Sequence, residues 1–142
     1  MKSPATPPSP CMDETAPGAG EIAALAEEIR AGFPPPFAAL AAPVLLRVEE
    51  LADEGMLRDL GLEDPFDLTG LYDGTPLTER LATDPPLGPD IVWLFRRAIL
   101  DEWIERGNIG LRDLIANVVV HEFAHHFGWS DADIARVDRW WE

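Results

Sequence analysis

The stretch VVVHEFAHHFGWSD, Val118 to Asp131, contains all three histidines of the 142-residue chain. On a helix with 100° per residue, His121 and His125 are about 40° apart and one turn apart along the axis, so their imidazoles can meet at one point. Glu122 lies roughly 60° from His125 on the same side, near that point but not at it. In an HExxH pattern the two neutral imidazoles bind Zn²⁺ and the carboxylate reaches a water molecule. The stretch therefore predicts a metal site with ligands His121 and His125 and with Glu122 as catalytic base.

The residues before the motif indicate where this helix, expected over residues 111–127, faces. The arc that the two histidines and Glu122 continue is apolar, with Leu111, Leu114, Ile115 and Val118. Ionisable side chains on an inward face are costly unless they are paired or bind a metal. The alternative to a metal site is a pair of core histidines that are hydrogen-bonded to neighbouring groups.

A catalytic zinc needs a third protein ligand and one open position. Gly128 is expected to end the helix with a positive φ, and Asp131 follows three residues later as the predicted third ligand. A carboxylate oxygen binds zinc at about 2.0–2.2 Å. Asp131 also fits a first-turn acid favoured by the dipole of a last helix. The competing carboxylates are those of Asp133, Asp138 and Glu142.

Two further residues are candidates for contacts with a substrate or a transition state. His126 lies about 40° beyond Glu122 on the helical wheel, and its alternative role is packing or support of the site from behind. Tyr72 is the only tyrosine, and its hydroxyl would donate to a developing oxyanion if its strand borders the cleft. The alternative for Tyr72 is an ordinary half-buried strand aromatic.

The spacing HExxHxxGxxD equals the extended metzincin signature with Asp in place of the third histidine. No methionine follows Met56, so the metzincin Met-turn is missing, which argues against full metzincin membership. The chain resembles the small bacterial zincin-like metallopeptidases from about Glu21 onward. The resemblance rests on LYDGTPLTER, on IVWLFRR and on VVVHEFAHHFGWSDADI.

This resemblance implies an α+β, minimal zincin-like fold, in which a small sheet packs on an active-site helix that carries HExxH. It also implies one zinc ion per chain, bound at the positions of His121, His125 and Asp131, with Glu122 as catalytic base. It does not imply a particular natural substrate.

The rest of the chain predicts a mixed set of short elements. Apolar periodicity and turn residues favour helices at 21–32, 36–43, 98–107 and 131–142, and strands at 44–51 and 91–95. Glu49 and Glu50 leave a helix as the alternative for 44–51. The segment ADEGMLRDLGLEDPFDL, residues 52–68, is expected to be mostly loop. Residues 71–80 predict a hairpin or an edge strand, since Asp73-Gly74 is a tight-turn signal.

Composition narrows the class of protein. The net charge of −15, from 26 acidic and 11 basic residues, argues against nucleic-acid binding. No segment approaches the roughly 18 apolar residues of a membrane span. The single cysteine, Cys11, excludes a disulfide within the chain, and a cytoplasmic location fits best. Residues 1–20, rich in proline and alanine, predict a disordered tail before a domain at 21–142.

These observations favour a zinc-dependent metallopeptidase that acts on a peptide or protein substrate. Because few residues follow Asp131, we expect no second lobe over the cleft, which leaves room for a partner protein that completes it. The alternative is a zinc-binding but non-catalytic protein-interaction module. A structural domain without metal is the third hypothesis.

Overall fold

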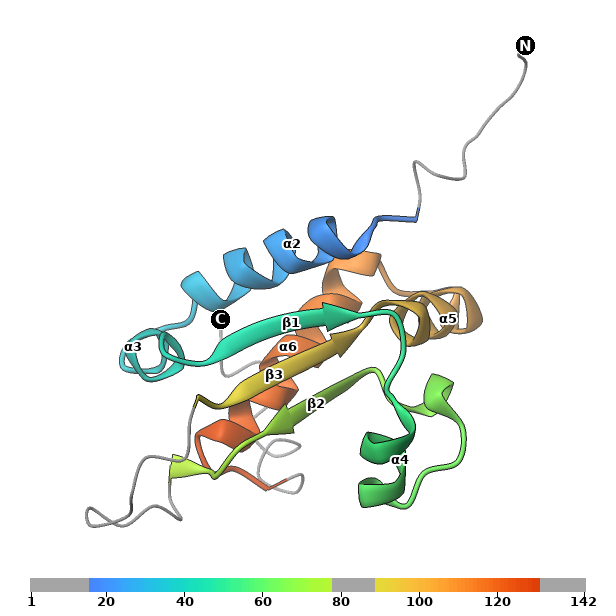
Figure 1. Cartoon of the computed structure of the whole chain (residues 1–142). Helices are drawn as coiled ribbons and strands as arrows, with labels where there is room; N and C mark the ends of the chain where they lie inside the picture. Colours follow the sequence, from blue (N-terminus) through green and yellow to red (C-terminus); the bar gives the residue numbers. More distant parts are fainter. Residues whose placement is uncertain (1–15, 78–88, 131–142) are drawn as a thin grey trace.

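The computed structural model describes residues 16–77 and 89–130 (Figure 1). These residues form an α+β fold, as the sequence predicts. The elements, in chain order, are α2 (Ala19–Ala31), α3 (Phe37–Ala41), β1 (Leu45–Glu49), α4 (Glu54–Leu60), the 3₁₀ helix η2 (Pro65–Asp67), β2 (Gly70–Asp73), β3 (Ile91–Phe95), α5 (Arg96–Arg106) and α6 (Leu111–His126). Within this described part, no helix has the length and apolar character needed to cross a bilayer.

Within the described residues, the sheet has three strands in the order β1-β3-β2. β1 runs parallel to β3, whereas β2 runs antiparallel to it and forms one edge of the sheet. The register places Tyr72 opposite Val92 and Gly70 opposite Leu94. α6 crosses behind the sheet and α2 runs beside β1 (Figure 1), with α2 in contact with both β1 and α6. β2 is thus the edge strand that lies against α6.

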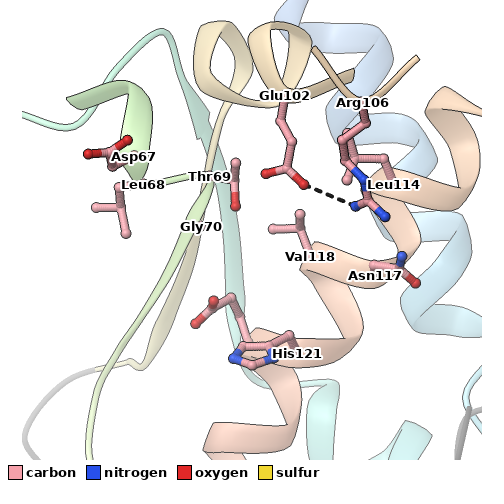
Figure 2. A pocket seen from close by; sticks show the side chains of 11 residues that line it. Asp67, Leu68, Thr69, Gly70, Glu102, Arg106, Leu114, Asn117, Val118 and His121 are labelled. Carbon is pink, nitrogen blue, oxygen red and sulfur yellow. Dashed lines mark hydrogen bonds and ion pairs between the residues drawn. The ribbon is translucent and has the colours of Figure 1, made fainter. Parts of the chain in front are cut away.

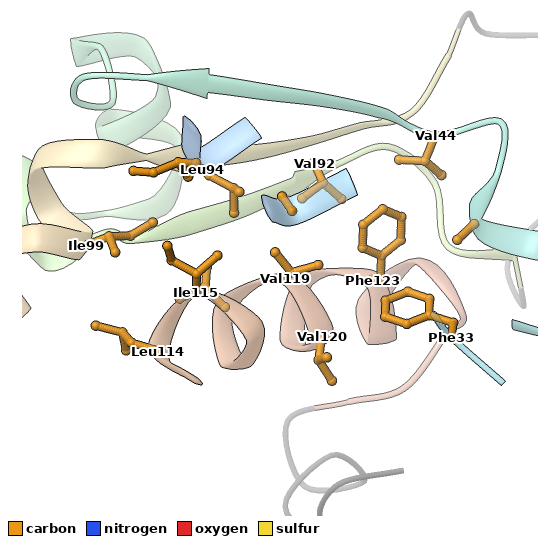
Figure 3. Close-up of a cluster of buried hydrophobic side chains, with 14 of the residues drawn as sticks. Phe33, Val44, Val92, Leu94, Ile99, Leu114, Ile115, Val119, Val120 and Phe123 are labelled. Atoms are coloured by element: carbon orange, nitrogen blue, oxygen red, sulfur yellow. The ribbon is translucent and has the colours of Figure 1, made fainter. Parts of the chain in front are cut away.

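The main core lies between α6, α2 and one face of the sheet (Figure 3). On the sheet, Val92 and Leu94 of β3 are fully buried, because alternate side chains of a strand point to the same face. On α6, Phe123 is also fully buried and packs edge-to-face on Phe33, with ring centroids 5.4 Å apart. This packing fixes the roll of α6 about its own axis.

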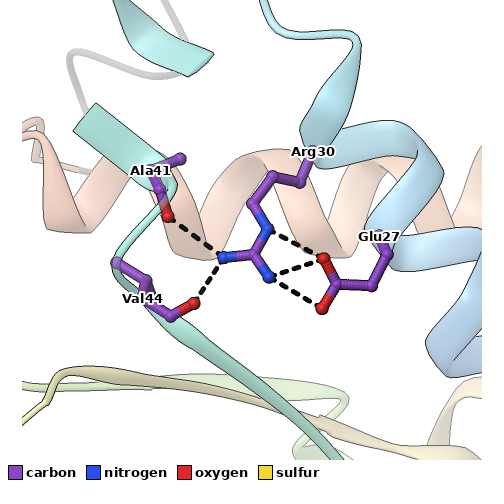
Figure 4. A network of polar contacts seen from close by, with 4 residues as sticks. All are labelled: Glu27, Arg30, Ala41 and Val44. Atoms are coloured by element: carbon purple, nitrogen blue, oxygen red, sulfur yellow. Dashed lines mark hydrogen bonds and ion pairs between the residues drawn. The ribbon is translucent and has the colours of Figure 1, made fainter. Parts of the chain in front are cut away.

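A polar network ties α2 to the start of β1 (Figure 4). The guanidinium of Arg30 donates to the carbonyl oxygens of Ala41, at 3.0 Å, and of Val44. It also forms an ion pair with Glu27 at 2.6 Å, and the Arg30 side chain is only 12% exposed. Since neither backbone carbonyl belongs to a regular ladder, the network satisfies acceptors where the chain turns into the sheet.

The predicted helices at 21–32, 36–43, 98–107 and the HExxH helix are confirmed, as are the strands at 44–51 and 91–95. The expectation of loop at 52–68 is wrong, because α4 and η2 form there. Asp53 caps α4 by accepting from the Met56 amide at 2.8 Å, and Gly61 ends it with a φ of 72°. An N-cap aspartate and a C-cap glycine were readable signals of this helix.

The predictions for residues 71–80, for the start of the domain and for the last helix have different outcomes. β2 ends at Asp73 and no strand follows within residues 74–77, so Asp73-Gly74 does not make a tight hairpin there. The edge-strand alternative is confirmed for residues 71–73, and residues 78–80 of the predicted segment lie outside the described residues. α2 begins at Ala19, two residues before the domain start expected at residue 21. The last predicted helix, at 131–142, lies outside the described residues.

Candidate metal centre

The last two turns of α6 bring His121 and His125 together. Their rings are nearly perpendicular, at 81°, with centroids 4.8 Å apart, and the two Nε2 atoms are 3.2 Å apart. Two nitrogens that each lie about 2.0–2.1 Å from a tetrahedral zinc are about 3.3 Å from one another. The two imidazoles therefore point at one position, with the spacing that a shared zinc ion requires.

The other nitrogen of His125 supports the same assignment. Its Nδ1 lies 3.1 Å from the carbonyl oxygen of Trp129, and because a carbonyl can only accept, Nδ1 carries the proton. Nε2, on the side of His121, is then left with a lone pair. A ligating histidine typically donates its second N–H to a carbonyl in this way. The chemistry of this donor pair therefore fits zinc.

The backbone turn after α6 places that carbonyl. Gly128 has a φ of 96°, which confirms the predicted positive φ at this position. The amides of Gly128 and Trp129 donate to the carbonyls of His125 and Ala124, both at 3.0 Å. Because glycine adopts a positive φ without steric cost, the chain can turn back at once and present the Trp129 carbonyl to the His125 ring.

His121 lies at one end of a cavity of about 330 Å³ (Figure 2), and Glu122 also lines this cavity. The start of β2 forms one wall, and α5 closes the opposite end with an ion pair between Glu102 and Arg106 at 3.1 Å. Val118 of α6 also lines this space. His121, Glu122 and His125 are half-buried, so the arc that is apolar at Leu114, Ile115 and Val118 becomes partly solvent-accessible at the motif.

β2 rests directly on α6 at this cavity. A Cβ at Gly70 would lie 2.6 Å from Cγ1 of Val118 and 3.2 Å from Cγ of Glu122, so no larger residue fits without a shift. Sequence reasoning missed Gly70. A glycine at the start of a strand is itself a signal of close backbone approach, which was available in the pattern.

His126 lies one turn after Glu122 on α6 and meets Tyr72 of β2, and neither residue lines the cavity. His126 is 2% exposed, and its Nδ1 lies 3.1 Å from both the Tyr72 hydroxyl and Oδ2 of Asp90. The Tyr72 hydroxyl donates to Asp90 at 2.8 Å. Nε2 of His126 faces the carbonyl of Leu40 at 3.2 Å. This placement favours the packing alternative for both residues over a contact with substrate, and it adds Asp90, which sequence reasoning missed.

The third predicted ligand, Asp131, lies outside the described residues, as do its competitors Asp133, Asp138 and Glu142. Among residues 16–77 and 89–130, no three His, Cys, Asp or Glu side chains gather as a metal-binding group. Within those ranges the structure shows two converging imidazoles.

Comparison with known families agrees with this geometry. A family model described as zincin-like metallopeptidase matches residues 41–141. The chain belongs to this family. The match to the zincin-like metallopeptidases includes the sheet, α6 and the position of Asp131, whereas α2 lies before it. Membership implies a hydrolase of the zinc peptidase type. No curated protein matches the chain in sequence.

Proposed function

We propose that this zincin-like protein is a zinc-dependent peptidase that cleaves peptide bonds with an activated water molecule. His121, His125 and Asp131 would hold one zinc ion, and Glu122 is the general base. The convergence of the two Nε2 atoms, 3.2 Å apart beside a cavity lined by Glu122, is the observation that carries the proposal. Two neutral imidazoles and one carboxylate are a ligand set found in catalytic zinc sites.

The chain's own residues divide the remaining work. Bound zinc would supply Lewis acidity towards the substrate carbonyl and would acidify a water molecule. Glu122 takes the proton of the attacking water and passes it to the leaving nitrogen, a role that contributes roughly 10²–10⁴-fold in rate. The Trp129 carbonyl keeps the His125 ring in the tautomer and orientation that the site needs.

In the part of the chain that the structure describes, no strand pairs with the side of β2 that faces away from β3, and this side offers a docking edge for the substrate. The Phe95 amide donates to the Thr69 carbonyl at 2.9 Å, so Thr69 bonds towards β3. Hydrogen-bonding directions alternate along an antiparallel strand, and the N–H and C=O of Gly70 consequently point away from β3. An extended peptide that adds here as a further strand would pass over α6 beside Glu122. One of its side chains would enter the 330 Å³ cavity. The substrate we propose is accordingly an extended segment of a peptide or protein.

The test combines metal analysis with hydrolysis of an unstructured protein such as reduced, carboxymethylated lactalbumin. The wild-type protein is expected to contain close to one zinc per chain and to lose hydrolysis when a chelator removes it. Glu122→Gln should retain zinc and lose about 10²–10⁴-fold in kcat/KM. Glu105→Gln, the same change at an exposed position on α5, serves as the matched control and should hydrolyse like wild type.

Two results would reject the proposal. Absence of zinc uptake on titration removes the metal site itself. Stoichiometric zinc with no hydrolysis of diverse peptides would instead establish the non-catalytic zinc-binding interaction module.

A further inference from the structure

The buried group formed by His126, Asp90 and Tyr72 takes no part in the proposed chemistry, although it lies one residue from a metal ligand. We call it the His126 network. Nε2 of His126 faces the Leu40 carbonyl at 3.2 Å and must carry a proton, since that oxygen only accepts. Nδ1 faces Asp90 and Tyr72, both at 3.1 Å. Both ring nitrogens are therefore engaged with named partners, which holds the ring in one orientation.

The His126 network joins four parts of the chain that are distant in sequence. His126 belongs to the last turn of α6, Tyr72 to β2, Leu40 to α3, and Asp90 directly precedes β3. The backbone carbonyl of Asp90 also accepts from the Leu45 amide at 2.9 Å, which reaches β1. One buried ring thus links α6 to the edge strand and to the entry of the central strand.

Two points determine how β2 lies on α6. At the first, Gly70 touches Val118 and Glu122 directly, with no space for a Cβ. At the second, two residues further along the strand, Tyr72 reaches His126. Because β2 has only four residues and pairs on one side with β3, these two points set both the height and the register of the strand over the HExxH turns.

The chain after β2 presses on the same network. A Cβ at Gly74 would lie 2.5 Å from both Cγ and Oδ1 of Asp90, so the Asp90 carboxylate fills the space beside the glycine backbone. Gly74→Ala would therefore displace the Asp90 carboxylate while His126, Asp90 and Tyr72 themselves remain unsubstituted.

We propose that His126 is a positioning residue which, through Asp90 and Tyr72, holds the edge strand β2 in register over the metal-binding face of α6. Its ring nitrogens face Tyr72, Asp90 and the Leu40 carbonyl, so it would act through these groups. Its consequence for catalysis rests on the proposed function, because β2 is the strand on which the substrate would dock. Its structural part, the anchoring of β2, does not depend on catalysis.

The contacts of Arg30 with Glu27 and with the carbonyls of Ala41 and Val44, which we call the Arg30 network, supply a matched control. The Arg30 side chain is also largely buried and bonds to backbone carbonyls and to a carboxylate, but it ties α2 to β1, at the edge of the sheet opposite β2 (Figure 4). Its loss should reduce stability without loosening β2. The Arg30→Leu and His126→Leu variants can therefore be compared at temperatures that lie the same number of degrees below the unfolding temperature of each variant.

The experiment measures native-state amide hydrogen exchange in the full-length protein. Because Thr69 bonds towards β3 and the bonding direction alternates along an antiparallel strand, the amides of Leu71 and Asp73 also bond towards β3. Their exchange rates therefore measure how firmly β2 is held. The Val44 amide, which donates to Ala41 at 3.0 Å, reports on the Arg30 side. His126→Leu should raise exchange at Leu71 and Asp73 about tenfold or more relative to Val44, and Arg30→Leu should do the reverse.

Milder variants keep the test informative if His126→Leu does not fold. Tyr72→Phe removes one hydroxyl and should raise exchange in β2 about fivefold. Gly74→Ala should act in the same direction. Equal acceleration of all amides in the His126 and Arg30 variants would overturn the proposal, because it would show a general loss of stability rather than release of one strand.

Hydrolysis provides the second readout. At a temperature where both variants are folded and hold one zinc, His126→Leu should lose about tenfold in kcat/KM and Arg30→Leu should stay close to wild type. Unchanged kcat/KM in a variant whose β2 exchanges faster would overturn the catalytic part. If the wild-type protein hydrolyses nothing, the proposed function fails, and the exchange data alone still decide whether His126 anchors β2.

Discussion

The last turns of α6 have two faces, and consecutive histidines belong to different ones. His125 is half-buried, and its Nε2 converges on that of His121 at the edge of a cavity-lining face. His126 is 2% exposed and faces Asp90, Tyr72 and the Leu40 carbonyl. A rotation of 100° about the helix axis separates the two side chains. The same residue type therefore faces the proposed metal position at one residue and buried protein groups at the next.

This difference teaches that the face, not the residue type, decides the role. The buried face is completed by protein groups, among them Phe123 against Phe33. On the face of the proposed metal site, which we call the metal-binding face, two nitrogen atoms lie 3.2 Å apart, and a bound cation would satisfy both lone pairs. Substitutions on the buried face should therefore change folding stability, and substitutions on the metal-binding face should change zinc affinity.

The largest effect is expected on the buried face, from Phe123→Ala. Phe123 is fully buried, and its truncation leaves a cavity that the packed core cannot fill, so the free energy of unfolding should fall by about 3–5 kcal/mol. Chemical denaturation of the metal-free protein measures this. Ile104→Ala, at a side chain that is 74% exposed, is the control and should stay within about 0.5 kcal/mol. Similar losses in both variants would contradict the burial pattern of α6.

The next effect separates the two histidines. His125→Ala removes a proposed zinc ligand, so zinc affinity should fall by more than about 100-fold, because loss of a residue that only supports a ligand already costs roughly 10–100-fold. His126→Ala removes only internal contacts, so its zinc affinity should stay closer to that of wild type while its folding stability falls. Chelator competition gives the affinities and denaturation gives the stabilities. A larger loss of zinc affinity in His126→Ala than in His125→Ala would show that His126, and not His125, belongs to the metal site.

The smallest effect concerns the contact where the two faces meet the edge strand. Gly70→Ala places a Cβ within 2.6 Å of Val118 Cγ1, and relief of this clash should cost about 1–3 kcal/mol of folding stability. Val118→Ala removes the clashing methyl group, so the double variant should recover part of the loss beyond additivity. A double-mutant cycle by thermal or chemical denaturation measures the coupling. Strict additivity would mean that β2 does not rest on α6 at this point.

Much of the architecture was readable from local patterns. The run of β-branched and aromatic residues at Ile91–Phe95, bounded by turn residues, predicted β3 correctly, and Gly107 and Gly128 marked helix ends that the structure confirms. The prediction of loop at 52–68 was wrong because the segment is rich in charged residues and has only a short apolar part around Leu57. Leu57 packs on Phe95 and Ala98, which belong to a distant part of the chain. Short helices of this kind owe their stability to such contacts more than to their own sequence.

The sequence by itself determined how His121, Glu122 and His125 are placed relative to one another on α6. Helical periodicity alone places His121 and His125 one turn apart with Glu122 beside them, because the backbone repeat is the same in every α-helix. It also determined the helix end at Gly128, where only glycine takes the required φ without strain.

Tertiary structure alone decided which strand lies over that face and what holds it there. Gly70, Tyr72 and Asp90 are far from the motif in sequence, and no periodicity relates them to it. Their roles arise because the strand order β1-β3-β2 puts β2 at the edge beside α6, where the bare Gly70 backbone touches Val118 and the Tyr72 hydroxyl reaches His126. Contacts between distant segments depend on the packing of the whole core, and a local pattern carries no record of them.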